Sequence, residues 1–320
     1  MGLVRYVLRR LAQAVFVLWA AFTLSFLILY LLPGDPVSIA LNGGAGVNQS
    51  NYTPEQIAAL RAEFGLDKPV IVQYFDQVWA AVRGDFGRSV TSGGRVSDLV
   101  LGALPNTVEI AGAGLVLATV FGAATAILGT LTRLKWLGQA LLSLPAVGIS
   151  LPVFWVGLVL VEVVSFQWGL LPAFGNDGFA SVILPAITIA LPAGAQIGQV
   201  LARSILTALG EPYIETARAK GAGRWRVHLG HALRNAIVPA VALSAVILGS
   251  LIAGAVIVET VFSRDGIGRL TAQAVTVQDI PVVQGVVVFA ALVFVVVNLV
   301  VDLVSPLLDP RITLRRLGHA

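Results

Sequence analysis

The sequence predicts an all-α integral membrane protein with six transmembrane helices. Its composition, the length of its apolar stretches and the placement of its basic residues predict this class. Apolar residues make up 57% of the 320 positions and charged residues 12%, about half the charged share of an average soluble domain. The mean hydropathy is +0.88. Such a chain is expected to lie largely within a bilayer.

Six stretches reach the roughly 20 apolar residues that a helix needs to cross the hydrocarbon core. They are 11–32, 107–131, 140–166, 182–206, 237–262 and 282–304. Pro145 and Pro152 interrupt the third stretch. The first has a longer apolar run than a signal peptide and no clear cleavage site, so we expect a retained signal anchor. Gly112, Gly114, Gly249 and Gly254 would let neighbouring helices approach closely.

Basic residues are unevenly distributed between the two sides of the predicted spans. The N-terminus, the connection after the second span, the region around 203–234 and the C-terminal tail hold 14 of the 21 Lys and Arg residues. The other seven lie in 33–105 and in the last connection. Because basic residues concentrate on the cytoplasmic side, we expect both termini of this multi-pass protein in the cytoplasm.

The segment 33–105 is expected to form an extracytoplasmic helical insertion. Thr53, Pro54 and Gln56 are typical of a helix start, and Gly65 can end that helix. A second helix would run from about Val70 to Gly84. Its predicted apolar face consists of Ile71, Tyr74, Phe75, Val78, Trp79 and Val82. We expect this cap to pack on the membrane domain; a scaffold role and contact with a delivering protein are the alternatives.

Motifs for catalysis and metal binding are missing from the sequence. Lys68, Lys135 and Lys220, the three lysines, do not follow glycine, so there is no Walker A loop. The chain has no cysteine, and its three histidines form no H-E-x-x-H pattern. We therefore expect no catalytic residue, no cofactor and no metal site in this chain, and no nucleic-acid partner.

The connection 208–236 carries the most informative pattern. Gly210-Glu211-Pro212 can start a helix and Gly221-Ala222-Gly223 can end it. The residues between are Tyr213, Ile214, Glu215, Thr216, Ala217, Arg218, Ala219 and Lys220. Three of these are small, so the helix could enter a groove of a partner and be oriented by its charged residues. An ordinary solvated basic loop is the alternative.

Polar residues inside the predicted spans are candidates for a translocation pathway, because ionisable groups in a membrane are costly and often functional. The residues concerned are Glu162, Asn298 and, at the outer end of the fifth span, Glu259. Glu109 and Asp302 lie nearer span ends. For Glu162, a structural hydrogen bond to a neighbouring helix is the alternative.

The segments 215–221 (ETARAKG) and 231–239 (HALRNAIVP) resemble the coupling loop of ABC importer permeases. The general motif is E-A-A, three residues, glycine, nine residues and I-x-L-P. This chain has Thr216 in the second place and 15 residues between Gly221 and Ile237. That longer spacing is similar to the dipeptide, oligopeptide and nickel branch.

Further segments along nearly the whole chain resemble the same branch. They are 32–36 (LPGDP), 64–69 (FGLDKP), 84–87 (GDFG), 259–262 (ETVF), 266–270 (GIGRL) and 308–311 (LDPR). Arg264 and Asp265 depart from the aromatic residue and proline that relatives often carry. The long outer segment is similar to the first, or B-type, permease of a pair.

The resemblance implies a type I importer permease bundle in a bacterial cytoplasmic membrane. Its parts would be 1–32 (N-terminus and first span), 33–105 (insertion), 106–306 (core, with coupling loop 208–236) and 307–320 (tail). The implied role is a non-catalytic subunit for di- or oligopeptide import. The implied partners are a second homologous permease, two ATP-binding subunits that hold ATP and Mg²⁺, and an extracytoplasmic substrate-binding protein. The ATPase-coupling residues would be Tyr213, Glu215, Thr216, Ala217, Arg218, Ala219, Lys220 and Gly221.

Other functions stay open at this point. Nickel or glutathione transport lies within the same family, although no predicted span contains a histidine, a preferred nickel ligand. A proton-coupled secondary transporter is a different class, and the lack of an internal repeat speaks against it. A membrane receptor or scaffold would bind partners without moving solute.

Overall fold

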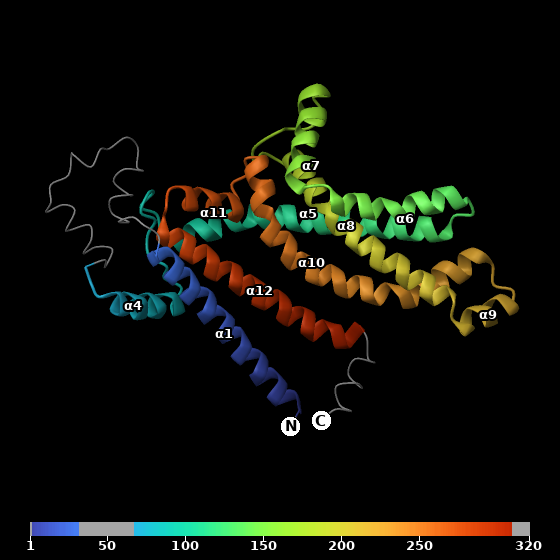
Figure 1. Cartoon of the computed structure of the whole chain (residues 1–320), viewed down its shortest axis with the longest axis horizontal. Coiled ribbons are helices and arrows are strands. Elements are labelled where there is room, and N and C mark those ends of the chain that lie inside the picture. Colours follow the sequence, from blue (N-terminus) through green and yellow to red (C-terminus); the bar gives the residue numbers. More distant parts are fainter. Residues whose placement is uncertain (1, 32–66, 309–320) are drawn as a thin grey trace. The chain divides into compact units, whose positions relative to one another are not determined.

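The computed structural model describes residues 2–31 and 67–308, and these are helical almost throughout (Figure 1). The α-helices are α1 (Gly2–Leu31), α4 (Val70–Val82), α5 (Val96–Leu131), α6 (Lys135–Ser150), α7 (Val153–Leu160), α8 (Ala180–Leu209), α9 (Pro212–Ala219), α10 (Leu233–Val261), α11 (Ile267–Thr276) and α12 (Ile280–Leu308). Two π-helices are η2 (Val161–Gln167) and η3 (Arg226–Ala232). The predicted all-α class is confirmed. The helix predicted at 53–65 lies outside the described residues.

Within residues 2–31 and 67–308, five helical stretches are long and apolar enough to cross a membrane. They are Leu8–Leu29, Val96–Leu131, Ala180–Leu209, Arg226–Ile252 and Ile280–Val297. They overlap the predicted first, second, fourth, fifth and sixth spans. A sixth span results only if α6 and the α7–η2 pair are taken as one.

The predicted third span, 140–166, is not one straight helix. Lys135–Ser150 and Val153–Gln167 are bent by 101°. The break lies at Leu151, whose backbone is extended (φ −83°, ψ 130°), as expected for a residue that precedes proline. Pro145, Pro185, Pro192 and Pro239 all lie inside helices. Only the tertiary structure shows that Pro152, unlike these four prolines, lies at a break between helices.

The chain divides into two compact units, each with its own apolar core. The first unit comprises Met1–Pro105 and Asp265–Val295, and the second comprises Asn106–Arg264 and Val296–Ala320. Helices α5 and α12 contribute to both. The domain bounds expected from the sequence stay predictions.

A buried aspartate organises the first unit. Asp279, 1% exposed, immediately precedes α12. Its carboxylate accepts hydrogen bonds from the hydroxyls of Ser89 and Thr91 and from the backbone N–H groups of Val90 and Thr91. Several hydrogen-bond donors around an ionised carboxylate stabilise it when it is buried. Asp279 thereby fixes the segment before α5 to the start of α12.

Helix α4 confirms one prediction and corrects another. It runs over Val70–Val82 and ends before Gly84, as the sequence predicts. Tyr74 packs against Phe22 and Phe26 of α1. Four other large residues of the predicted apolar face, unlike Tyr74, are exposed: Ile71, Phe75, Trp79 and Val82 are 60–74% exposed. The expectation that this face packs on the protein is therefore wrong for these four.

Helix α8 lies at the centre of the second unit and packs against α6, α7 and α10. Its backbone also approaches that of α5 closely. A Cβ atom added to Gly122 would lie 2.5 Å from the Gly194 carbonyl oxygen and 2.9 Å from the Gly198 nitrogen. Of the four glycines predicted to allow close approach, Gly114 does so, because an added Cβ would lie 2.6 Å from Ile189 Cδ1 of α8. At Gly249 an added Cβ makes an ordinary contact at 3.6 Å, and at Gly112 and Gly254 it meets no described atom within 4 Å.

We predict that Gly122→Ala destabilises the second unit by about 1–3 kcal/mol, because the added methyl forces α5 away from α8. Thermal unfolding in detergent micelles measures the loss. Gly112→Ala is the matched control on the same helix and is expected to be neutral or slightly stabilising. Equal melting temperatures for the two variants would contradict the close packing of α5 on α8.

Candidate coupling site and buried polar cluster

The short helix α9 is set by local signals at both ends. Pro212 occupies its first turn after the extended residue Glu211. At the other end, Gly221 has φ +83°. The Gly221 N–H donates to the Arg218 carbonyl at 2.9 Å and the Ala222 N–H donates to the Ala217 carbonyl at 3.0 Å. This pair of bonds is a Schellman motif, which favours glycine at the left-handed position.

One side chain fixes α9 to the rest of the second unit. Ile214 is 0% exposed and belongs to the main apolar core. Around it, the Asn235 amide donates to the Tyr213 hydroxyl at 3.1 Å. Ala217 is half-buried and packs on the same core. The helix is therefore held by its inner face.

Two side chains after α9 connect the loop to the end of α5. Arg224 donates from Nη2 to the Thr132 carbonyl at 3.0 Å. His228, 2% exposed, lies 2.9 Å from the Thr130 hydroxyl through Nε2. The Thr130 hydroxyl already donates to the Ala126 carbonyl at 2.7 Å, so His228 Nε2–H is the donor to it. These bonds join the α9 region to α5 within one unit.

The outer face of α9 is polar and accessible. Glu215, Thr216, Arg218, Ala219 and Lys220 are all exposed or partly exposed, with Ala217 turned to the core. The structure thus gathers most of the predicted coupling residues on one surface. Their contact with an ATPase stays a prediction.

We predict that Gly221→Ala weakens the end of α9 by about 1–2 kcal/mol, because an L-residue is strained at positive φ. Hydrogen–deuterium exchange of the 213–222 peptide should then be roughly tenfold faster. Gly223→Ala is the control, since Gly223 lacks a positive φ and an added Cβ meets no described atom within 4 Å. Unchanged exchange in Gly221→Ala would show that α9 does not need glycine at its end.

A buried polar cluster lies where α5, α8 and α10 meet. Glu259 is 0% exposed and accepts a hydrogen bond from the Thr107 hydroxyl at 2.6 Å. Arg264, also 0% exposed, donates to Ser181 Oγ at 2.7 Å and pairs with Glu109 at 3.3 Å. Buried charges need such partners. Arg264, where the sequence departs from the family pattern, thus connects three elements.

The predicted pathway residues lie in different surroundings. Glu162 is exposed on η2 and accepts a hydrogen bond from Gln167 at 3.3 Å. Glu259 is buried in α10. Asn298 lies in α12, and its side chain is outside the described part of the structure. A shared pathway stays a prediction.

Two family models together match nearly the whole chain. Residues 114–314, which include α9 and η3, match the family described as "Binding-protein-dependent transport system inner membrane component". Residues 3–111 match the corresponding N-terminal family. The chain belongs to the binding-protein-dependent transport system inner membrane component family. The permease is therefore a multi-pass membrane protein.

Relatives of the permease cover almost its full length. It is 33% identical over 314 residues to a "Putative peptide transport system permease protein" of Brucella suis, covering 96% of this chain and 98% of the relative. It is also 33% identical over 314 residues to the "Glutathione transport system permease protein GsiC" of Escherichia coli K12, covering 97% and 99%.

Solved structures show the same fold as the permease. An amino acid ABC transporter chain has a TM-score of 0.51 at 17% identity, over 67% of this chain and 94% of that chain. A chain of the MetNI methionine ABC transporter, in an inward-facing conformation, has a TM-score of 0.53 at 18% identity, over 66% and 96%. The importer permease fold expected from the sequence is confirmed.

Several residues that hold α9 and the segment after it in place were not predicted from the sequence. Ile214, Thr130, Arg224 and His228 carry the contacts that hold α9 and its loop in place. Thr130 and His228 are 98 positions apart. The sequence signal for His228 was weak, because it lies in a basic connection and such connections are usually solvated.

Proposed function

We propose that this permease is a subunit of an ATP-driven importer of di- or oligopeptides. It would form half of the translocation pathway and carry no catalytic residue of its own. The observation that carries the proposal is α9: a short helix with an exposed charged face, fixed to the membrane helices through the buried Ile214.

The geometry explains how a partner could drive transport. An ATPase that grips Glu215, Arg218 and Lys220 would move α9 when its own shape changes. Because α9 is held by the core and its loop is bonded to the end of α5, the movement would reach the membrane helices. The ATPase shifts the equilibrium between inward-open and outward-open forms only through its different affinity for each.

The proposed assembly contains this chain, a second homologous permease, two ATP-binding subunits and an extracytoplasmic binding protein. The ATP-binding subunits would hold ATP and Mg²⁺. Both termini and α9 would face the cytoplasm, in agreement with the placement of 14 of the 21 basic residues. The two solved relatives, both parts of ABC transporters, support the assembly.

The peptide substrate is supported by the names of the full-length relatives. One is a putative peptide permease and the other a glutathione permease, each at 33% identity. Glutathione is itself a tripeptide. It is the second candidate substrate, favoured by that equal similarity.

ATP-dependent uptake in proteoliposomes tests the proposal. The co-purified complex and its binding protein are offered labelled dipeptide, oligopeptide, glutathione or nickel, with and without ATP. We expect peptide uptake that requires ATP and collapses when this chain carries Gly221→Asp. Uptake independent of both would indicate a secondary transporter, and glutathione or nickel as the single transported solute would reassign the substrate.

Glu162 is the pathway residue that we propose contacts the substrate. Its exposed carboxylate could pair with the ammonium group of a peptide. We predict that Glu162→Gln raises the half-saturating peptide concentration in the uptake assay about tenfold, the usual size of a lost charged hydrogen bond. Gln167→Ala, which removes only its neighbour's amide, is the control. Unchanged uptake in Glu162→Gln would restrict Glu162 to a structural role.

A further inference from the structure

Helix α4 has three sides with different surroundings: α1, a cavity and an exposed apolar stripe. On one side, the Tyr74 ring lies edge-to-face with Phe26 at 5.3 Å. The Tyr74 hydroxyl donates to Thr23 Oγ at 2.8 Å, because the Thr23 hydroxyl hydrogen is used by the Trp19 carbonyl. These contacts attach α4 to the C-terminal part of α1.

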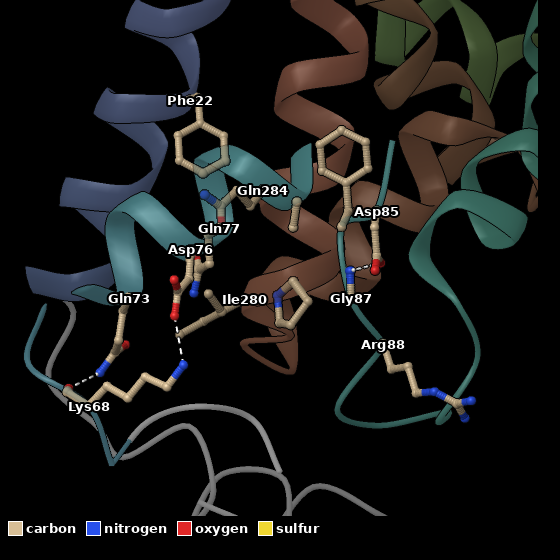
Figure 2. Close-up of a pocket in the computed structure, with 13 residues that line it drawn as sticks. Phe22, Lys68, Gln73, Asp76, Gln77, Asp85, Gly87, Arg88, Ile280 and Gln284 are labelled. Atoms are coloured by element: carbon tan, nitrogen blue, oxygen red, sulfur yellow. Dashed lines mark hydrogen bonds and ion pairs between the residues drawn. The ribbon is translucent and has the colours of Figure 1, made fainter. Parts of the chain in front are cut away.

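Beside these contacts, the polar residues of α4 line a cavity of about 530 Å³ (Figure 2). From α4 it receives Gln73, Asp76 and Gln77, and from α12 it receives Gln284. The buried atoms Gln77 Oε1 and Gln284 Nε2 have no protein partner among the described residues. Such groups are usually satisfied by water, so this side of α4 is wet.

The remaining face of α4 is apolar and is not covered by any of the residues that the structure describes. Ile71, Phe75, Trp79 and Val82 follow one another at spacings of four, four and three residues and are 71%, 64%, 60% and 74% exposed. This spacing places them on a single stripe. We call these four residues the α4 stripe. A contiguous row of exposed, large apolar side chains indicates an interaction surface.

The α4 stripe lies on a helix that is attached to α1. Leu8–Leu29 of α1 is long and apolar enough to cross a membrane, and its Leu24, Leu27 and Ile28 are 59%, 49% and 63% exposed. Tyr74 attaches α4 to this same part of α1 through Phe22, Thr23 and Phe26. Figure 1 shows α4 running across the end of α1 rather than alongside it.

Basic residues flank α4 at both of its ends. Lys68 precedes α4 and pairs with Asp76 at 2.7 Å. The hydrogen bond and charge of Asp76 raise the pKa of Lys68 above its usual value, so it stays protonated. Arg83 follows α4 and lies over the Trp79 ring at 4.6 Å. Tryptophan beside arginine or lysine is typical of the boundary between acyl chains and phosphate headgroups.

We propose that α4 lies in the plane of a bilayer interface, with the α4 stripe among the lipid acyl chains and Lys68 and Arg83 at the headgroup phosphates. The helix thereby separates lipid from the wet cavity behind it. This inference goes beyond the proposed function, since it requires a membrane location and no particular substrate.

Spin labelling tests the proposal cleanly, because the chain has no cysteine. Single-cysteine variants Phe75→Cys, Trp79→Cys and Asp76→Cys are labelled with a nitroxide and reconstituted as the complete importer complex. Asp76 is the matched control: it neighbours Phe75, is similarly exposed (55% for its side chain) and lines the cavity. Power saturation then compares collisions with oxygen, which partitions into lipid, and with a water-soluble nickel chelate.

Labels at positions 75 and 79 are expected to collide several-fold more with oxygen than with the nickel chelate, and the label at 76 to show the reverse order. Low collision with both reagents at 75 and 79 would mean that protein rather than lipid covers the stripe, and would overturn the proposal. High collision with the nickel chelate there would mean open water, and would overturn it too. Repeating the measurement with the binding protein added shows whether that protein is the cover.

Discussion

Ile214→Ala in the permease is expected to leave ATP hydrolysis in the complex but to reduce peptide import at least about tenfold. Ile214 is the buried residue of α9 and is 0% exposed. Truncating a buried isoleucine costs about 2–5 kcal/mol, since it leaves a cavity as well as losing apolar contact. Much of that loss falls on the attachment of α9, which then moves without moving the membrane helices.

Ile214→Val provides a graded control for this experiment, because it removes a single methylene and costs about 0.5–1.5 kcal/mol. Import should fall in the order wild type, valine variant, alanine variant. Co-purification of the ATP-binding subunits checks that each complex is intact. An intact Ile214→Ala complex that imports peptide at the wild-type rate would show that α9 does not transmit the movement.

Asp279→Ala is expected to destabilise the first unit by about 3 kcal/mol. It removes the acceptor for two hydroxyls and two backbone N–H groups at Ser89, Val90 and Thr91. A buried donor left without a partner costs about 1–3 kcal/mol. The destabilisation should be smaller than the sum of this cost over all four donors, because Thr91 is exposed and can form hydrogen bonds with water instead. Asp279 also accepts a hydrogen bond from the Val282 N–H in the first turn of α12 at 3.5 Å, and the loss of this cap adds to the effect.

Thermal unfolding in detergent micelles measures the global loss, and limited proteolysis around residue 90 measures the local release of the segment before α5. Asp279→Asn keeps the shape and one acceptor oxygen, so its melting temperature should lie between those of wild type and Asp279→Ala. An alanine variant that melts with the wild type and resists protease equally would show that Asp279 does not hold this segment in place.

Local sequence signals were enough to predict individual helices. Pro212 and Gly221 bound α9, and Gly84 follows the end of α4. These signals act within one turn of the backbone, so they need no information about distant residues. The segment 215–221, read together with 231–239, indicated the family for the same reason: its spacing is a property of the chain itself.

Interactions between distant residues could not be predicted in the same way. Asp279 and Ser89 are 190 positions apart, and Arg264 and Glu109 are 155 apart. A polar residue in the sequence carries no sign of which distant donor or acceptor it meets. The same limit applies to Gly122, whose contact with Gly194 depends on how α5 and α8 cross.

The sequence by itself determined the all-α membrane class, most of the spans, the family and the position of helix α9, because apolar length and turn residues act locally. The tertiary structure alone decided which proline breaks a helix, which distant carboxylate pairs with the buried Arg264 and which face of α4 is covered. Periodicity defines an apolar face but not its neighbour. Tyr74 meets α1 while Trp79 stays exposed, since only the packed arrangement of helices decides which part of that face finds protein.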